Sequence, residues 1–399
     1  MKIALIHFNL TTESGDTKII LSVANELKKM GHAIVVYCAE FDSQACFPRL
    51  NKGLDIRVVP PEIALASTRG AAGTIAKIME RVSRTRIYND LIRKMSAVIE
   101  KDFDYIVCEN DYSYKIGLFY KKIRPGTKII WVMHNPPFFH SAKKNILADL
   151  LSRCVAWYEK RLARKYGRGV DWIVAYDAPT ERYAAEVGRP TKILRLPTDV
   201  AYFHVPVKTR TVSEKGVLLL GVGALNPHRR FEDIISAVGL LRERDWDARA
   251  TIICKDFYGN KEYRSEFGAF LERSGVAEHI DARFAGASEE EYLTAMRLGD
   301  VFIFPTDVKI WAVGACEAAS AGLPLIISKA TAMAEVFHDG VDALFVDVLQ
   351  PRQIADKVEL LLRDREFAVR VALAGQKFVE SEMSLDAYAR EILKAPIHS

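Results

Sequence analysis

The chain has 399 residues, of which 49% are hydrophobic and 27% charged, a composition that excludes a disordered protein and is usual for a folded one. This length is too great for one hydrophobic core and favours two or three domains. The formal net charge of +5 divides unevenly: residues 1–200 hold 32 Lys and Arg against 21 Asp and Glu (net +11), and residues 201–399 hold 24 against 30 (net −6).

No apolar run reaches the roughly 18 residues that cross a bilayer, and Met1–His7 is too short and too soon polar for a signal peptide. The six cysteines are scattered without a Cys-x-x-Cys pair, which favours reduced, buried thiols. We therefore expect a cytoplasmic protein.

In the first half, short apolar runs rich in β-formers alternate with helical patterns such as Thr17–Met30. The expected strands are Ile3–Phe8, Ile34–Cys38, Ile56–Val59, Tyr105–Cys108, Ile129–Met133, Trp172–Ala175 and Ile193–Leu196. This alternation predicts a parallel sheet covered by helices on both faces.

Polar residues follow several of these strands, where a parallel sheet binds ligands. Asn9 and Gly15 lie in the turn after the first strand, and the amides after Gly15 open a helix that favours anions. Glu109 and Asn110 follow the fourth strand, and His134 ends the fifth, so we predict that these residues line one crevice and contact an acceptor.

Basic residues concentrate in two segments of the first half, 69–101 and 143–168. They predict either a partner with negative charge, such as an anionic membrane or a phosphorylated acceptor, or a solvated basic surface. No motif that reads nucleic-acid bases is present, so nucleic acid is not expected.

The second half repeats the alternation, with expected strands at Val217–Val222, Ala250–Cys254, Ala282–Phe284, Val301–Phe304, Leu325–Ile327 and Ala343–Val346. A linker is expected from Leu196 to Glu214, because it contains two prolines and a charged run without apolar periodicity. The last helical pattern, Arg365–Leu393, is broken near Ser381–Ser384. Two doubly wound α/β domains follow from this pattern.

Other sites are less well supported by the sequence. Gly221-Val-Gly-Ala-Leu-Asn lacks the third glycine of a dinucleotide fingerprint. Asp102-Phe-Asp104 and Asp245-Trp-Asp247 each flank a turn between a helix and a strand, so we assign them no metal. No Cys and His cluster indicates zinc.

Residues 301–347 combine an apolar strand, a loop, a helix of small residues around Glu317, a Gly-Leu-Pro turn and a second strand. This segment resembles the donor-binding segment of family 4 glycosyltransferases, in which the pattern is Glu-x7-Glu, Ala-x-Ala-x-Gly-x-Pro and Gly-Gly-x-x-Glu. Glu317 matches the second Glu and Glu335 the last, whereas Lys309 stands at the first Glu and Thr331-Ala332 at the glycine pair.

The resemblance extends over essentially the whole chain and implies the role of several residues. Gly223-Ala-Leu-Asn-Pro-His-Arg-Arg-Phe matches a family motif whose Lys, which binds the donor diphosphate, falls on Arg229, with Arg230 as a second cation. Phe284-Ala-Gly matches a loop whose backbone reads the nucleotide base. The implied catalytic residues are His134, Glu317 and Arg229, and the implied donor-binding residues are Gly15, Arg229, Arg230, Phe284, Lys309, Val313, Gly314 and Glu317.

The resemblance also implies the fold and the reaction. We expect a GT-B fold, in which two doubly wound Rossmann-like domains, residues 1–200 and 201–375, face each other across a cleft and a C-terminal helix, 376–399, returns to the first domain. The implied enzyme is a hexosyltransferase that transfers a sugar from a UDP- or GDP-linked donor to a glycan or lipid-linked acceptor, with retention of configuration and without metal or other cofactor. It would be cytoplasmic, peripheral on the inner membrane face. The alternative is a catalytically silent GT-B protein that binds a nucleotide sugar or a partner.

Lys309 departs from the family pattern because an ammonium only donates hydrogen bonds and reverses the local charge. Three explanations remain open from sequence: the donor sugar is anionic, Lys309 pairs with Asp307 or another acid, or the protein binds a donor without transferring its sugar.

Overall fold

The computed structural model describes residues 1–61, 74–109, 112–134, 136–139, 146–207, 216–256 and 259–396. The chain divides into two compact units, of which unit 1 comprises Met1–Leu196 and Leu385–Ser399, and unit 2 comprises Pro197–Ser384. The first boundary therefore lies at Leu196 rather than at 200. The second lies at Ser384 rather than at 375, so that α13 (Arg365–Glu382) belongs to unit 2.

Unit 1 is built on a seven-stranded parallel sheet in the order β5-β3-β1-β6-β7-β8-β9. Its strands are β1 (Lys2–Ile6), β3 (Ala33–Cys38), β5 (Asp55–Val58), β6 (Tyr105–Cys108), β7 (Lys128–Val132), β8 (Trp172–Ala175) and β9 (Thr191–Ile193). Each expected strand is present, with ends shifted by a few residues. The sequence missed the two-residue strands β2 (Asn9–Leu10) and β4 (Glu40–Phe41), which pair with each other.

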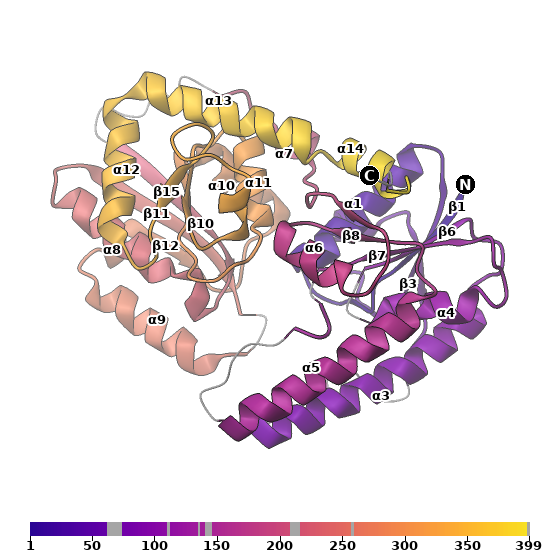
Figure 1. Ribbon diagram of the computed structural model, residues 1–399. Coiled ribbons are helices and arrows are strands. Elements are labelled where there is room, and N and C mark those ends of the chain that lie inside the picture. Colours follow the sequence, from indigo (N-terminus) through magenta and orange to yellow (C-terminus); the bar gives the residue numbers. More distant parts are fainter. Residues whose placement is uncertain are drawn as a thin grey trace. The chain divides into compact units, whose positions relative to one another are not determined.

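Apolar side chains alternate along these strands, so that Ala4 and Ile6 of β1 face one core cluster of the unit. The helices described in unit 1 are α1 (Gly15–Lys29), α2 (Pro48–Asn51), α3 (Thr74–Val98), α4 (Ile116–Tyr120), α5 (Ile146–Gly167), α6 (Ala178–Ala185) and α14 (Leu385–Ile392). The long helices α3 and α5 lie side by side (Figure 1), joined by the hydrogen bond from Thr85 Oγ1 to Glu159 Oε1 at 3.1 Å.

The C-terminal helix α14 packs on α1, although 188 residues of unit 2 precede it in the chain. Tyr388, Ala389 and Ile392 are buried there, and Lys192 of β9 donates to the Glu391 carboxylate at 2.6 Å. Helix α14 is thus part of the core of unit 1.

Unit 2 has a six-stranded parallel sheet in the order β12-β11-β10-β13-β14-β15. Its strands are β10 (Gly216–Ala224), β11 (Asp247–Lys255), β12 (Ile280–Arg283), β13 (Val301–Phe304), β14 (Leu325–Ser328) and β15 (Leu344–Val346). Val301 and Ile303 of β13 face one core cluster, and Phe302 and Phe304 face the other. The sheet is therefore buried on both faces, as the sequence predicts.

The helices of unit 2 are α7 (Val200–Phe203), α8 (Phe231–Arg242), α9 (Lys261–Arg273), α10 (Glu289–Leu298), α11 (Val313–Ser320), α12 (Pro351–Arg363) and α13. Helix α8 packs against α12 and β11, whereas α11 packs against α13 and α7. The helical pattern expected over Arg365–Leu393 is divided at Met383–Ser384 into α13 and α14.

In both sheets the strand order reverses beside the first strand, between β1 and β6 in unit 1 and between β10 and β13 in unit 2. Ligands of doubly wound sheets bind at this switch point, outside the carboxyl ends of the strands. The topology thus identifies one candidate site in each unit.

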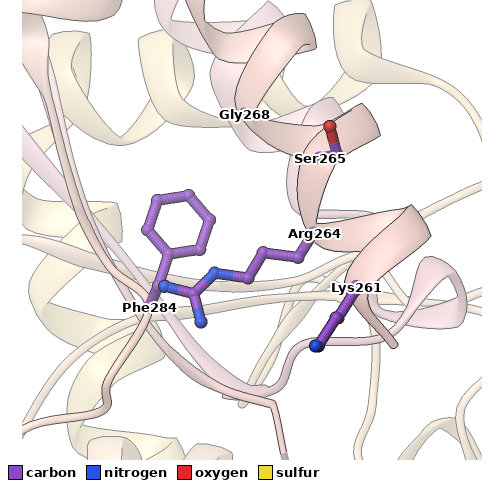
Figure 2. A pocket seen from close by; sticks show the side chains of 5 residues that line it. All are labelled: Lys261, Arg264, Ser265, Gly268 and Phe284. Atoms are coloured by element: carbon purple, nitrogen blue, oxygen red, sulfur yellow. The ribbon is translucent and has the colours of Figure 1, made fainter. Parts of the chain in front are cut away.

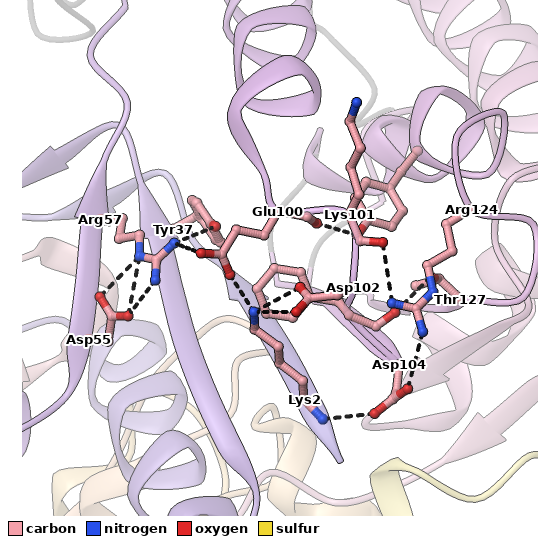
Figure 3. A network of polar contacts seen from close by, with 12 residues as sticks. Lys2, Tyr37, Asp55, Arg57, Glu100, Lys101, Asp102, Asp104, Arg124 and Thr127 are labelled. Carbon is pink, nitrogen blue, oxygen red and sulfur yellow. Dashed lines mark hydrogen bonds and ion pairs between the residues drawn. The ribbon is translucent and has the colours of Figure 1, made fainter.

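The opposite edge of the unit 1 sheet holds a network of ion pairs (Figure 3). Lys2 Nζ lies 2.8 Å from Asp102 Oδ1, and the Lys2 amide donates to Asp104 Oδ2 at 2.8 Å. Arg57 joins Asp55 to Glu100, in each case at 2.8 Å. The Asp102-Phe-Asp104 run is therefore occupied by cations of the protein itself, on the side of the sheet away from the switch point.

The other Asp-x-Asp run is similarly engaged, because Asp247 pairs with Arg242 at 2.8 Å. The cysteines follow the prediction with one difference. Cys38, Cys46, Cys108, Cys254 and Cys316 are buried, whereas Cys154 is exposed on α5.

Candidate functional site

Three loops meet at the carboxyl edge of the unit 2 sheet, after β10, β13 and β14. The His228 carbonyl, in the first loop, accepts hydrogen bonds from Thr306 Oγ1 at 2.7 Å and from the Asp307 amide at 3.3 Å. The Ile310 carbonyl, in the second, accepts from Thr331 Oγ1 at 2.7 Å. These bonds hold the residues of the matched motifs at one edge of the sheet.

Arg229 lies across the switch point. A Cβ added to Gly223 would stand 3.1 Å from Arg229 Nε, and the guanidinium carbon lies 5.2 Å from the centre of the Phe304 ring. Gly223 is the last residue but one of β10 and Phe304 is the last of β13, so the cation lies between the two strands where the order reverses. The absence of a side chain at Gly223 leaves room for the guanidinium there.

Arg230 is placed differently from the prediction of a second phosphate contact. Its backbone is left-handed, with φ of 55°, and its guanidinium donates to Asp233 Oδ1 at 2.7 Å and to Oδ2 at 3.3 Å. Asp233 lies in the first turn of α8, so this pair holds the turn that presents Arg229. The guanidinium of Arg230 is thus engaged within the protein.

Lys309 forms an ion pair with Glu335, and the carboxylate of the nearby Asp307 has its Oδ1 2.8 Å from His228 Nδ1. Of the three explanations that the sequence leaves open, the geometry fits pairing with an acid, although the acid is Glu335 rather than Asp307. Both side chains are about two-fifths exposed, at 44% and 37%, so the pair lies at the surface of the candidate site.

Glu317 lies at the middle of α11 with 3% of its surface exposed, and Tyr292 Oη of α10 donates to its Oε2 at 2.5 Å. Burial and the neighbouring Glu317 carboxylate raise the pKa of Tyr292 well above its usual value, so the phenol remains a donor. Sequence reasoning missed Tyr292, because nothing in the pattern of α10 distinguishes it from a core aromatic residue.

The start of α11 has no side-chain cap, since its N-cap residue is Ala312. Val313 and Gly314 open the helix, and a Cβ at Gly314 would lie 3.4 Å from Tyr292 Oη and 3.8 Å from Val222 of β10. Small residues thus bring the uncapped helix start close to the strands of the switch point. A helix end of this kind favours negative charge.

Phe284 follows β12, near the opposite edge of the sheet. Its ring packs on Phe267, with centroids 5.7 Å apart, and the Arg264 guanidinium lies 5.4 Å from its centre. A surface pocket of about 410 Å³ opens beside it, lined by Lys261, Arg264, Ser265, Gly268 and Phe284 (Figure 2). The Gly286 amide donates to the Cys254 carbonyl at 3.1 Å, which ties this turn to the end of β11.

In unit 1, His7 follows β1 at the switch point and is 4% exposed. Its Nε2 lies 3.4 Å from Asp16 Oδ2, beside Gly15 at the start of α1. Desolvation opposes ionisation of Asp16, but the nearby His7 imidazole, with Ser14 and His134, outweighs it and holds the Asp16 pKa well below its usual range. His7 was not predicted, although a histidine at a strand end was the signal used for His134.

Asn9, predicted to contact an acceptor, is engaged locally. Its side-chain oxygen accepts from the Thr11 amide at 2.9 Å and from Thr11 Oγ1 at 2.6 Å. Its amide nitrogen donates to Glu40 at 3.4 Å. Asn9 is thus the first residue of β2, and its side chain is engaged by Thr11 and by Glu40 of the paired strand β4.

Glu109 follows β6 and His134 follows β7, and Glu109 Oε2 lies 3.6 Å from His134 Nε2. The Glu109 side chain is fully buried, whereas the imidazole is 14% exposed. Tyr388 of α14 is buried nearby, and its pKa is raised by burial and by the Glu109 charge. The Glu109 carboxylate therefore lies on the buried side of the His134 imidazole. Asn110, the other predicted acceptor contact, lies outside the described residues.

Two further properties concern the described ranges only. No three or more His, Cys, Asp or Glu side chains gather there in a way that would hold a metal ion. None of the helices described is both long and apolar enough to cross a bilayer.

The chain is similar in sequence to known glycosyltransferases. Residues 208–378 match the family described as glycosyl transferases group 1. A GDP-mannose-dependent alpha-(1-6)-phosphatidylinositol monomannoside mannosyltransferase of Mycobacterium tuberculosis is 24% identical over 267 residues, covering 62% of this chain and 68% of the relative. A D-inositol 3-phosphate glycosyltransferase of Corynebacterium glutamicum is 27% identical over 201 residues, covering 50% and 45%.

Among solved structures, Anabaena Alr3699/HepE in complex with UDP and glucose has a TM-score of 0.72 at 14% identity and covers 98% of each chain. Sucrose-phosphate synthase of Thermosynechococcus elongatus has a TM-score of 0.69 at 13% identity, covering 98% of this chain and 97% of the other. These likenesses confirm the GT-B fold that the sequence resemblance implied. Residues 208–378 thus carry a glycosyl transferases group 1 domain, and the sequence relatives are glycosyltransferases.

Proposed function

We propose that this glycosyltransferase takes a neutral hexose from a UDP- or GDP-linked donor, without a resident metal or other cofactor, and transfers it with retention of configuration to an anionic acceptor, an inositol phosphate or a lipid-linked glycan. The observation that carries the proposal is the convergence of Arg229, the uncapped start of α11 and the buried Glu317 at one switch point. Donor specificity among relatives is consistent with it, since one uses GDP-mannose and a structural neighbour binds UDP.

The unit 2 site provides positive groups that can stabilise a departing nucleoside diphosphate. Negative charge grows on the diphosphate as the glycosidic bond breaks, and fixed positive groups that face it lower the barrier. Arg229 offers a planar fork of donors to phosphate oxygens, and the first amides of α11 add the positive end of a helix dipole. No metal ion is needed for this stabilisation.

Glu317 completes the donor site as a hydrogen-bond acceptor. An ionised carboxylate accepts hydrogen bonds from ribose hydroxyls, and the Tyr292 phenol on its Oε2 holds it in one orientation. We assign the recognition of ribose to Glu317 and its positioning to Tyr292. The Phe284 turn is assigned to the base, with Arg264 over the aromatic ring as the neighbouring cation.

A neutral donor sugar follows from the Lys309–Glu335 pair. The charge of Lys309 is balanced by a carboxylate of the same site, so no anionic sugar is required to compensate it. Glu335 then offers acceptor oxygens beside the position where the family has its first Glu. The reversed charge at Lys309 was the main argument for a catalytically silent protein. Glu335 balances that charge, which weakens the argument.

The acceptor is assigned to unit 1, where His7 and His134 are each held by a carboxylate. The buried Glu109 orients the His134 imidazole, which presents its exposed edge to a hydroxyl group. The net charge of +11 over residues 1–200 favours an acceptor that carries phosphate. A peripheral position on an anionic membrane would bring such an acceptor within reach.

The experiment that tests this function is a transfer assay on the full chain with radiolabelled UDP- and GDP-hexoses. The acceptors are inositol 3-phosphate and vesicles that contain phosphatidylinositol. We expect transfer with one donor, a product with the anomeric configuration of the donor, and unchanged rates after metal chelation. Inverted product would contradict retention, and a chelator-sensitive rate would contradict catalysis without metal. Donor binding without any transfer would favour the silent alternative.

A further inference from the structure

The outer face of α5 exposes large apolar side chains that the proposed reaction does not use. Ile146 is 87% exposed, Leu150 57% and Trp157 63%, and their spacing of four and then seven residues places all three along one line of the helix. Tyr158, at 53%, lies beside this line. Three large apolar side chains in one exposed row are unusual for a surface helix.

The opposite face of α5 packs against the rest of unit 1. Ala163 is buried in the unit 1 core, and Tyr166 packs against that core. Glu159 is 2% exposed and accepts the hydrogen bond from Thr85 of α3. Burial of this face holds α5 in place, so the exposed row is not needed to fold unit 1.

Cations accompany the apolar row. Arg161 and Lys165 are exposed on the same face, and the Arg161 guanidinium carbon lies 5.9 Å from the centre of the Trp157 ring. No carboxylate partner of these two cations is found among the residues that the structure describes. Of the two acids in α5, Glu159 is buried and Asp149 accepts from Arg153 at 2.8 Å. The exposed face is therefore apolar toward its beginning and positive toward its end.

We propose that this face of α5 docks on the surface of an anionic lipid bilayer, with Trp157, Leu150 and Ile146 inserted at the level of the headgroups and Arg161 and Lys165 against lipid phosphates. Interfacial helices combine an apolar face, an aromatic residue at the headgroup level and flanking cations in this way. A protein partner is less well matched, because the centre of such an interface is depleted of Lys and of unpaired charge.

This inference deepens the proposed function, because a docked unit 1 would meet a lipid-linked acceptor in the plane of the bilayer. It does not require sugar transfer to be measured. Failure of docking would leave transfer to a soluble inositol phosphate intact, and failure of transfer would leave docking intact. The two are therefore tested separately.

The test uses the full chain and vesicles of phosphatidylcholine with or without phosphatidylglycerol. Trp157 is the reporter, since Trp131 and Trp172 are buried and Trp246 and Trp311 are partly buried. We expect binding to the anionic vesicles alone, with a blue shift of the emission and quenching by brominated lipids. Glycerophosphoglycerol, the soluble headgroup, is expected not to compete. Competition by it would mean a headgroup pocket and would overturn the proposal.

Matched variants test whether vesicle binding depends on this face of α5. Trp157→Ser should lower the partition coefficient about tenfold or more, since one large apolar side chain is lost from the interface. Leu298→Ser, at an equal 63% exposure in unit 2, should leave it unchanged. Trp157→Phe should retain binding and lose most of the quenching. Equal partition of the Trp157→Ser and Leu298→Ser proteins would overturn the proposal.

The charge component has its own control. The double variant Arg161→Glu/Lys165→Glu should lose about tenfold or more in binding at low salt, because each basic residue near an anionic surface contributes. The control is Arg370→Glu. Arg370 is also exposed and lies over an aromatic ring, that of Phe367, but on a helix of unit 2. This variant should bind vesicles as wild type does. Sedimentation without lipid should give one mass for wild type and Trp157→Ser. A dimer that Trp157→Ser dissociates would make this face a contact between copies and overturn the proposal.

Discussion

Lys309 and Glu335 neutralise each other at the edge of the proposed donor site in unit 2. Lys309 belongs to the loop after β13, and Glu335 to the 3₁₀ turn after β14, Ala332–Glu335. The pair thus joins two loops that the Thr331–Ile310 hydrogen bond already ties together. Lys309 has the opposite charge to the Glu of the family pattern, and its pairing with Glu335 leaves this surface without net charge.

Charge exchange tests this pair. Lys309→Glu would set two carboxylates against each other and should lower kcat/KM for the donor about tenfold, while Lys309→Glu/Glu335→Lys should recover most of the loss. The stability change should stay below about 1 kcal/mol, because the pair is partly exposed. Transfer rates from paired donors that differ only at C6 complete the test. A preference of wild type for the uronic acid over the neutral hexose would contradict a neutral sugar site.

Tyr292→Phe removes the donor to the buried Glu317 carboxylate. We expect a loss of about 1.5–3 kcal/mol of stability, measured by urea unfolding, because a charged acceptor loses its partner. Donor affinity in calorimetry should fall as well. Tyr263→Phe is the control, since Tyr263 is also buried and donates to a carboxylate, Glu232, at 2.8 Å. That variant should lose stability with donor affinity intact, and a similar loss of affinity in both would remove Tyr292 from the donor site.

Glu109→Gln keeps the shape of the side chain and removes the charge behind His134. If Glu109 positions the imidazole, kcat should fall about tenfold, with donor affinity unchanged. His134→Ala should cost about 100-fold, within the usual range for a group that contacts the reacting atoms. Steady-state kinetics with each substrate varied in turn separates these effects. Full activity of Glu109→Gln would show that the carboxylate is only a core residue.

Lys115 gives a prediction on pH. Its ammonium is fully buried, donates to Asn89 at 3.0 Å, and lies 4.8 Å from the Tyr112 ring centre. Burial lowers its pKa from 10.5 to about 8, opposed by the Glu159 charge. Between these values the unfolded chain holds a proton that the folded chain has lost, so stability rises with pH.

The window is therefore pH 8 to 10.5, and the shift of about 2.5 units (10.5 − 8) corresponds to about 3 kcal/mol. The free energy of unfolding of wild type should rise by that amount across the window relative to Lys115→Met, in which the titrating group is absent. Denaturant unfolding at several pH values provides the measurement. Parallel curves for the two proteins would place the Lys115 pKa near its ordinary value.

The strands were predictable because buried parallel strands leave nearly continuous apolar runs, as in Val301–Phe304. The sequence predicted which loop residues lie at the carboxyl edge of the sheet. It did not predict which of them contact each other. Lys309 and Glu335 are 26 residues apart, and only the fold sets one beside the other. His7 was overlooked since it extends an apolar run, and Tyr388 because its helix is separated from unit 1 by the whole of unit 2.

Calorimetric titration of wild type and Arg229→Ala with UDP, GDP, uridine and guanosine tests the central claim most directly. We expect one diphosphate to bind wild type far more tightly than its nucleoside. Arg229→Ala should lower diphosphate affinity by about 1.5–3 kcal/mol, the contribution of a charged hydrogen bond, and leave nucleoside affinity unchanged. Equal losses for diphosphate and nucleoside would move Arg229 away from the phosphates. No binding of either diphosphate to wild type would contradict a nucleotide-sugar donor site in unit 2.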